Sequence, residues 1–133
     1  MPDASPRVPL RLLPERYAIC RYPLTDDGVL PALPPVIGFA SLTVTDREIS
    51  LVCAEQVAPE GAEIDAGWRA LYAEGPMPFA LTGVIASLVG PLSAEGLSVF
   101  VTSTYDGDVL LVEADALDRA MTILTDRGHA ITT

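Results

Sequence analysis

The chain has no lysine and only one histidine among its 133 residues. All eight Lys/Arg positions are arginines, and they face 18 acidic residues, which gives a formal net charge of -10. A charge of this sign repels the phosphate backbone of nucleic acids and the headgroups of anionic lipids. We therefore expect neither a nucleic acid nor a membrane surface as a partner.

Long apolar runs are missing as well, because Pro, Gly or a charged residue interrupts each one before the roughly 18 residues of a membrane-spanning helix. The first residues lack the basic-then-apolar pattern of a secretory signal. Only two cysteines occur, Cys20 and Cys53, in apolar runs without CxxC spacing. We expect a cytoplasmic protein with two buried, reduced thiols and with neither a metal nor another cofactor.

Common catalytic motifs are also absent. No GxGxxG or GK[ST] sequence opens a predicted helix, and the chain has no GxSxG and no credible Cys–His pair. His129 has no second histidine nearby, and we expect it to be exposed or to lie on an edge strand. The sequence therefore predicts a protein without catalytic activity.

Hydrophobic residues make up half of the chain, and the mean hydropathy is +0.37. A chain of this length forms one domain or two very small fused ones. Its apolar content exceeds what a small two-layer domain covers, since sheet faces and edges need a partner. We expect a homo-oligomer, at least a dimer.

The second half, residues 65–133, carries the clearest pattern of elements. Apolar residues at i, i+3 and i+7 predict a helix between Thr82 and Gly96, and a second helix follows Asp115. Asp-Gly at 106–107 predicts a tight hairpin turn. Strands are expected over 68–73, 97–102, 109–112 and 129–132. This order, β-α-β-β-α-β, predicts an α+β, ferredoxin-like fold.

The first half reads as a degenerate copy of that plan, on element order alone. Residues 1–9 are expected to be a tail, and residues 10–64 the degenerate half. In that half the Pro-rich segment 23–35 stands where a first helix belongs. The expected strands are 10–13 and 17–22, separated at Pro14, and a hairpin of 38–43 and 48–53, followed by a turn-like stretch at 59–66.

A candidate ligand site lies at the start of the first predicted helix. Thr82 is the expected N-cap, and the amides of Gly83, Val84 and Ile85 are free to bind a carboxylate at the positive end of the helix dipole. The simpler interpretation is a helix cap with no further role.

The acidic hairpin is the second part of the candidate site. Asp106 and Asp108 flank Gly107, Thr104 precedes them, and their oxygens could accept from an ammonium group. The simpler interpretation makes them turn-forming residues in water. An amino acid, which carries a carboxylate and an ammonium group, needs both kinds of site.

Two stretches, GPMPFALTGVIASLVGPL at 75–92 and STYDGDVLLV at 103–112, carry a family resemblance. Together with FASLTVTDREISLVC at 39–53 they are similar to the ACT domains of small bacterial proteins related to the CASTOR-type arginine sensors, over about residues 10–133. The resemblance implies a regulatory ACT fold of two tandem halves that binds an amino acid. Asp108 matches an aspartate that serves the ligand in the sensors, whereas Leu81 stands where they have a glutamate.

The sequence thus predicts a regulatory module that binds a small molecule, an amino acid, without catalysis. One alternative is an ACT module for structure or protein interaction that binds no ligand. A second is a small isomerase or hydrolase on the same fold, for which only Asp106, Asp108 and the distant His129 offer proton-transfer groups.

Overall fold

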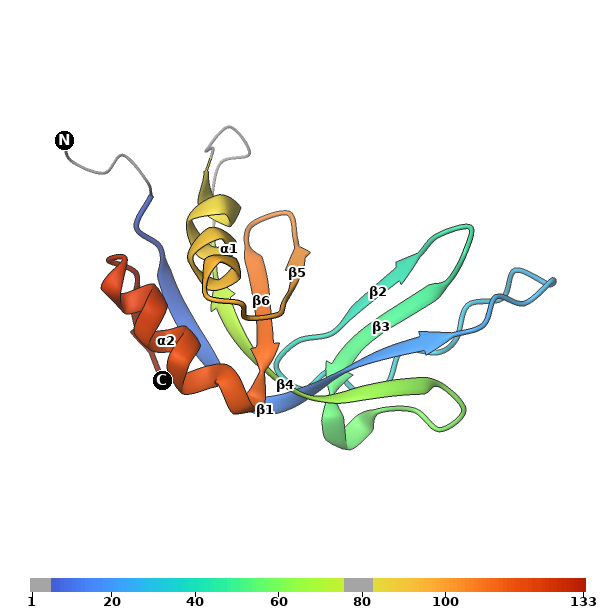
Figure 1. The fold of residues 1–133 in the computed structure, drawn as a ribbon. Helices are drawn as coiled ribbons and strands as arrows, with labels where there is room; N and C mark the ends of the chain where they lie inside the picture. Colours follow the sequence, from blue (N-terminus) through green and yellow to red (C-terminus); the bar gives the residue numbers. More distant parts are fainter. Residues whose placement is uncertain (1–5, 76–82) are drawn as a thin grey trace. The chain divides into compact units, whose positions relative to one another are not determined.

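The structure is a computed structural model that describes residues 6–75 and 83–133. The chain divides into two compact units, one combining the N-terminal residues through Leu13 with Arg69–Thr133, the other Pro14–Trp68. Figure 1 shows the elements: β1 (Pro9–Tyr22), β2 (Ser41–Val44), β3 (Ile49–Ala54), the short 3-10 helix η1 (Glu55–Val57), β4 (Glu63–Ala73), α1 (Val84–Ala94), β5 (Val99–Ser103), β6 (Asp108–Glu113), η2 (Ala114–Ala116), α2 (Leu117–Asp126) and β7 (Ala130–Thr132).

The unit that contains both α-helices follows the predicted order, β4-α1-β5-β6-α2-β7. Its two helices pack together on one face of its strands (Figure 1). Leucines from helices and strands form one buried cluster, including Leu71, Leu88, Leu110 and Leu124. The predicted α+β class is confirmed.

One strand of this unit comes from a distant part of the sequence. Residues Pro9–Arg11 of β1 pair in parallel with β7, and β1 is also a neighbour of β4. The order in this unit is therefore β7-β1-β4-β6-β5. In a simple β-α-β-β-α-β sheet β7 would pair with β4, whereas here the first residues of β1 lie between them. Val8, expected in a frayed tail, is 4% exposed.

The other unit is built around β1 and β3, which pair in antiparallel fashion. Its strand order is β2-β3-β1-β4, and the predicted hairpin of β2 and β3 is confirmed. Between β1 and β2 the chain has no helix or strand, as expected for the Pro-rich segment. The division into halves at residues 64 and 65 stays a prediction.

Three boundaries differ from the sequence-based expectation. β1 runs without a break through Pro14, where two strands were expected, and the carbonyl of Leu13 accepts a hydrogen bond from the Arg69 guanidinium at 3.3 Å. β4 already begins at Glu63, inside the stretch expected to be a turn. Asp115, expected directly before the second helix, lies within η2, and α2 begins at Leu117.

His129, expected to be exposed or to lie on an edge strand, is buried at 4% exposure and directly precedes β7. Its Nδ1 accepts from the Val8 amide at 3.0 Å, so its Nε2 carries the proton and donates to the Ser87 carbonyl at 3.1 Å. Pro91, four residues after Ser87 in α1, has no N–H to donate to that carbonyl. The imidazole thus supplies the donor that the proline removes.

The two cysteines lie on neighbouring strands, with Ala18 opposite Cys53 and Cys20 opposite Leu51. Both side chains are buried in the same apolar cluster. Burial raises the pKa of Cys20 to about 11, with Cys53 adding to the effect, and burial also raises the pKa of Cys53. Near neutral pH both groups are therefore neutral thiols, which are poor nucleophiles.

We predict that a thiol reagent labels Cys20 and Cys53 slowly in the native protein near neutral pH and rapidly after denaturation. Because the pKa of Cys20 is raised, native labelling should accelerate as the pH rises toward about 11. Labelling kinetics followed by mass spectrometry measure this. Native labelling as fast as in the denatured chain would contradict the prediction.

We predict that His129→Ala lowers the free energy of unfolding by about 2–4 kcal/mol, because it leaves the Val8 amide and the Ser87 carbonyl buried without partners. In a Pro91→Ala background the restored N–H can donate to the Ser87 carbonyl. His129→Ala should therefore lower the free energy of unfolding by about 1 kcal/mol less in that background than in the wild type. Urea unfolding of the four proteins measures this coupling. An equal cost in both backgrounds would show that Pro91 and His129 act independently.

Candidate functional site

The start of α1 forms one part of the predicted site. The helix begins at Val84, and its N-cap is Gly83, with a φ of +82° and no side-chain capping bond among the described residues. Such a φ strongly favours glycine. The first-turn bond runs from the Ser87 amide to the Gly83 carbonyl at 2.9 Å. The predicted cap, Thr82, lies outside the described residues, and the structure assigns the N-cap position to Gly83.

The first two residues of α1 differ in exposure. Val84 is buried at 7%, whereas Ile85 is 36% exposed. Their amides belong to the first turn, where a helix has no partner of its own for its N–H groups. The start of α1 can therefore offer backbone donors and the positive end of the helix dipole to an anion.

The β5–β6 hairpin forms the other part. The Thr104 amide donates to the Gly107 carbonyl at 2.8 Å, and the Thr104 hydroxyl donates to that carbonyl and accepts from the Gly107 amide, both at 3.1 Å. The Thr104 hydroxyl is thus already used within the turn. Asp106 at the tip is exposed.

Asp108 is held by the strand opposite. It pairs with Ser103, whose hydroxyl donates to the Asp108 Oδ1 at 2.6 Å. No hydrogen bond within the described part of the chain uses Oδ2 of this carboxylate. Asp108 is half-buried at the hairpin end, so one oxygen is fixed in position and the other remains available as an acceptor.

Gly107 fixes where the hairpin lies. It is buried, and a Cβ at this position would clash with the Ala73 carbonyl oxygen and come within 3.2 Å of the Gly75 amide nitrogen. The hairpin tip therefore lies against the end of β4, where the chain leaves for α1, and α1 itself contacts β5. The structure thus brings the acidic hairpin to residues 73–75, at the end of β4.

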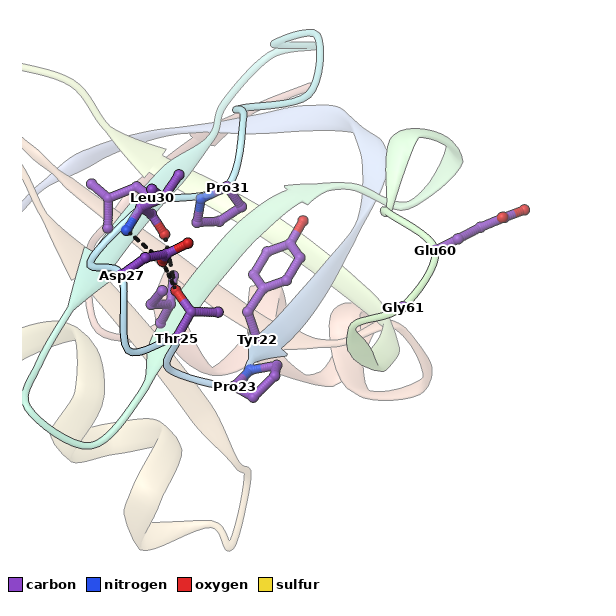
Figure 2. Close-up of a pocket in the computed structure, with 10 residues that line it drawn as sticks. Tyr22, Pro23, Thr25, Asp27, Leu30, Pro31, Glu60 and Gly61 are labelled. Carbon is purple, nitrogen blue, oxygen red and sulfur yellow. Dashed lines mark hydrogen bonds between the residues drawn. The ribbon is translucent and has the colours of Figure 1, made fainter.

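A pocket in the other unit was missed by the sequence-based reasoning. It has a volume of about 370 Å³ and lies among residues at the end of β1 and in the segment that follows it (Figure 2). Ile49, Glu60 and Gly61 complete the lining. Its lining includes Tyr22, Asp27, Leu30, Pro31, Ile49 and Glu60. The one available signal was the group of apolar residues within the Pro-rich segment, such as Val29 and Leu30, which the structure leaves 65% and 51% exposed.

Residues 6–75 and 83–133 contain no cluster of three or more His, Cys, Asp or Glu side chains arranged to hold a metal ion. In the same residues, no helix is both long and apolar enough to cross a membrane.

Comparison with known proteins gives one family match, to the ACT domain, over residues 63–126. Protein Atu0741 from Agrobacterium tumefaciens has a solved structure with a TM-score of 0.85 and 38% sequence identity, covering 96% of this chain and 94% of that protein. No curated protein matches the chain.

Two more distant structures share the fold. The protein VC0802 from Vibrio cholerae matches with a TM-score of 0.70 and 18% identity, over 92% of this chain and 91% of its own. The regulatory subunit of aspartate kinase from Thermus thermophilus matches with a TM-score of 0.63 and 11% identity, over 90% of this chain and 97% of that one.

These likenesses confirm the predicted ferredoxin-like ACT fold. The two distant structures support the fold alone, because their identity to this chain is low. The relative from Agrobacterium matches along nearly the whole of both chains, and the family match covers β4 to α2. The chain therefore belongs to the family of ACT domain proteins.

Proposed function

We propose that this protein is a regulatory module that binds an amino acid without catalysing a reaction, as the sequence predicted. The observation that carries the proposal is the contact of Gly107 with the end of β4, which holds the acidic hairpin beside residues 73–75. The same unit contains the start of α1, which has no side-chain cap among the described residues. Carboxylate oxygens and backbone N–H donors thus belong to neighbouring segments of one unit.

The two parts match the two charges of an amino acid. The Oδ2 of Asp108 is placed to accept from the ammonium group, while the amides of Val84 and Ile85 can donate to the carboxylate. The likeness to a regulatory subunit of aspartate kinase fits this role, since that protein is regulatory by name. The resemblance to the arginine sensors supports the same ligand class, and Leu81 in place of their glutamate leaves the side chain of the ligand open.

A second candidate function is an interaction module that binds no ligand. It is favoured by the hydrogen bonds of Thr104 with Gly107 and of Ser103 with Asp108, since a purely structural hairpin would be closed in this way. In the isomerase or hydrolase alternative, His129 is not available for proton transfer, because both of its ring nitrogens are used in hydrogen bonds within the protein. We propose a cytoplasmic location for either function.

We predict that Asp108→Asn weakens amino-acid binding roughly tenfold to a hundredfold, because a charge-assisted hydrogen bond contributes about 1.5–3 kcal/mol. The amino acid for the titration is the one that raises the melting temperature most in a thermal-shift comparison of all the standard amino acids. Calorimetry on folded wild-type and variant protein measures the loss.

Asp106→Asn is the matched control, because Asp106 is exposed at the same turn and is expected to shape it. Its affinity for the amino acid should stay near the wild-type value. Equal affinity of wild type and Asp108→Asn would exclude this carboxylate from the site. A thermal shift with none of the amino acids would favour the interaction module.

We also propose a homo-oligomer. Several large apolar side chains in the Pro-rich segment and directly after it are at least 44% exposed: Leu24, Val29, Leu30, Leu33 and Val36. An apolar group of this kind is unfavourable in water and favours association. Sedimentation at micromolar concentration should give at least a dimer, and a monomer under these conditions would contradict the proposal.

A further inference from the structure

The pocket beside Tyr22 lies where the Pro-rich segment follows β1 and the chain forms no helix. Its volume of about 370 Å³ falls within the range of small-molecule sites. All of its lining residues belong to the unit formed by Pro14–Trp68, so it shares no residue with the α1 start or the β5–β6 hairpin.

The charges around this pocket are all of one sign. Asp27 and Glu60 contribute carboxylates, and the lining contains no arginine or histidine. Figure 2 shows the Glu60 side chain pointing away from Tyr22, whereas Asp27 lies beside Thr25 and Leu30. An anionic ligand would meet unbalanced negative charge here, and a cation would meet charge of opposite sign.

Asp27 is held in one position by its neighbours. Its Oδ1 accepts from the Thr25 hydroxyl at 2.6 Å and from the Val29 amide at 3.0 Å. These bonds, that of Thr25 first, lower the pKa of Asp27, which keeps it ionised. No other residue that the structure describes donates a hydrogen bond to its Oδ2.

Tyr22 supplies an aromatic surface in the same pocket. Its ring lies between Pro23 and Pro31 in Figure 2 and is half-buried. Leu30 and Ile49 add apolar side chains to the lining. An aromatic ring and a fixed carboxylate that line the same pocket can together recognise an organic cation, through the ring face and through the charge.

We infer that this pocket is a second ligand site, separate from the amino-acid site, and that it takes a small organic cation with an apolar or aromatic body and an ammonium group. The apolar body occupies the space lined by Tyr22, Leu30, Pro31 and Ile49, and the ammonium group donates to Asp27.

The test compares three probes with nearly the same body: phenethylamine, 2-phenylethanol and 3-phenylpropionate. Backbone amide NMR of the full chain should show phenethylamine shifting residues at 22–31, 49 and 60–61, with at least about tenfold weaker binding of the alcohol and the carboxylate. No shift at these residues with millimolar phenethylamine, or binding of the alcohol or the carboxylate as tight as that of phenethylamine, would overturn the inference. Shifts confined to 83–85 and 104–108 would also overturn it without affecting the amino-acid proposal.

Asp27→Asn keeps an oxygen that can accept from Thr25 and Val29 but removes the charge. It should weaken phenethylamine binding roughly tenfold and leave 2-phenylethanol binding unchanged. The matched control is Asp26→Asn, which changes an exposed neighbour outside the lining by the same atoms and the same charge. If the two variants weaken phenethylamine binding equally, Asp27 acts only through the net charge of the protein. That result would contradict the proposed contact between Asp27 and the ammonium group.

Discussion

The hydrogen bonds of His129 hold together the unit that carries the proposed amino-acid site. Pro91 leaves the Ser87 carbonyl of α1 without its helical donor, and the buried imidazole satisfies that carbonyl while accepting from Val8. One side chain thus joins the helix, the segment before β1 and the segment before β7. The parallel pairing of Pro9 with Ala130 directly follows these contacts. The strand order of the unit and the position of α1 depend on this interaction.

The proposed site depends on a second constraint, the lack of a side chain at Gly107. Only a glycine lets the hairpin tip approach the Ala73 carbonyl without a clash, and this approach brings Asp108 to the end of β4. A ligand that contacts both the hairpin and the α1 start would connect these two segments. Binding would then stabilise this end of the unit, which is the physical basis of a regulatory module.

Much of the fold could be predicted from the sequence, because the decisive patterns are local. The apolar spacing around Leu88 and Leu124 predicts the helices, and Asp-Gly at 106–107 predicts the hairpin. The features that the sequence did not reveal depend on contacts between distant residues. Nothing near His129 in the sequence indicates its bonds to Val8 and Ser87, and nothing near Pro9 indicates its pairing with β7.

The candidate site could be predicted only in outline. Residue types and the family resemblance indicated Asp108 and the helix start, and the hairpin turn formed at the expected residues. The identity of the cap depends on where the first turn of α1 begins, which a shift of one or two residues changes. The pocket beside Tyr22 was not foreseen, because an irregular segment has no periodicity from which a cavity can be inferred.

The most direct test of the central claim is backbone amide NMR of the labelled protein with each standard amino acid at saturating concentration. If an amino acid lies between the α1 start and the hairpin, the amides of Gly83, Val84, Ile85 and residues 104–108 should shift together, with a single affinity. Shifts at only one of these two segments, or at neither of them with any amino acid, would contradict the claim.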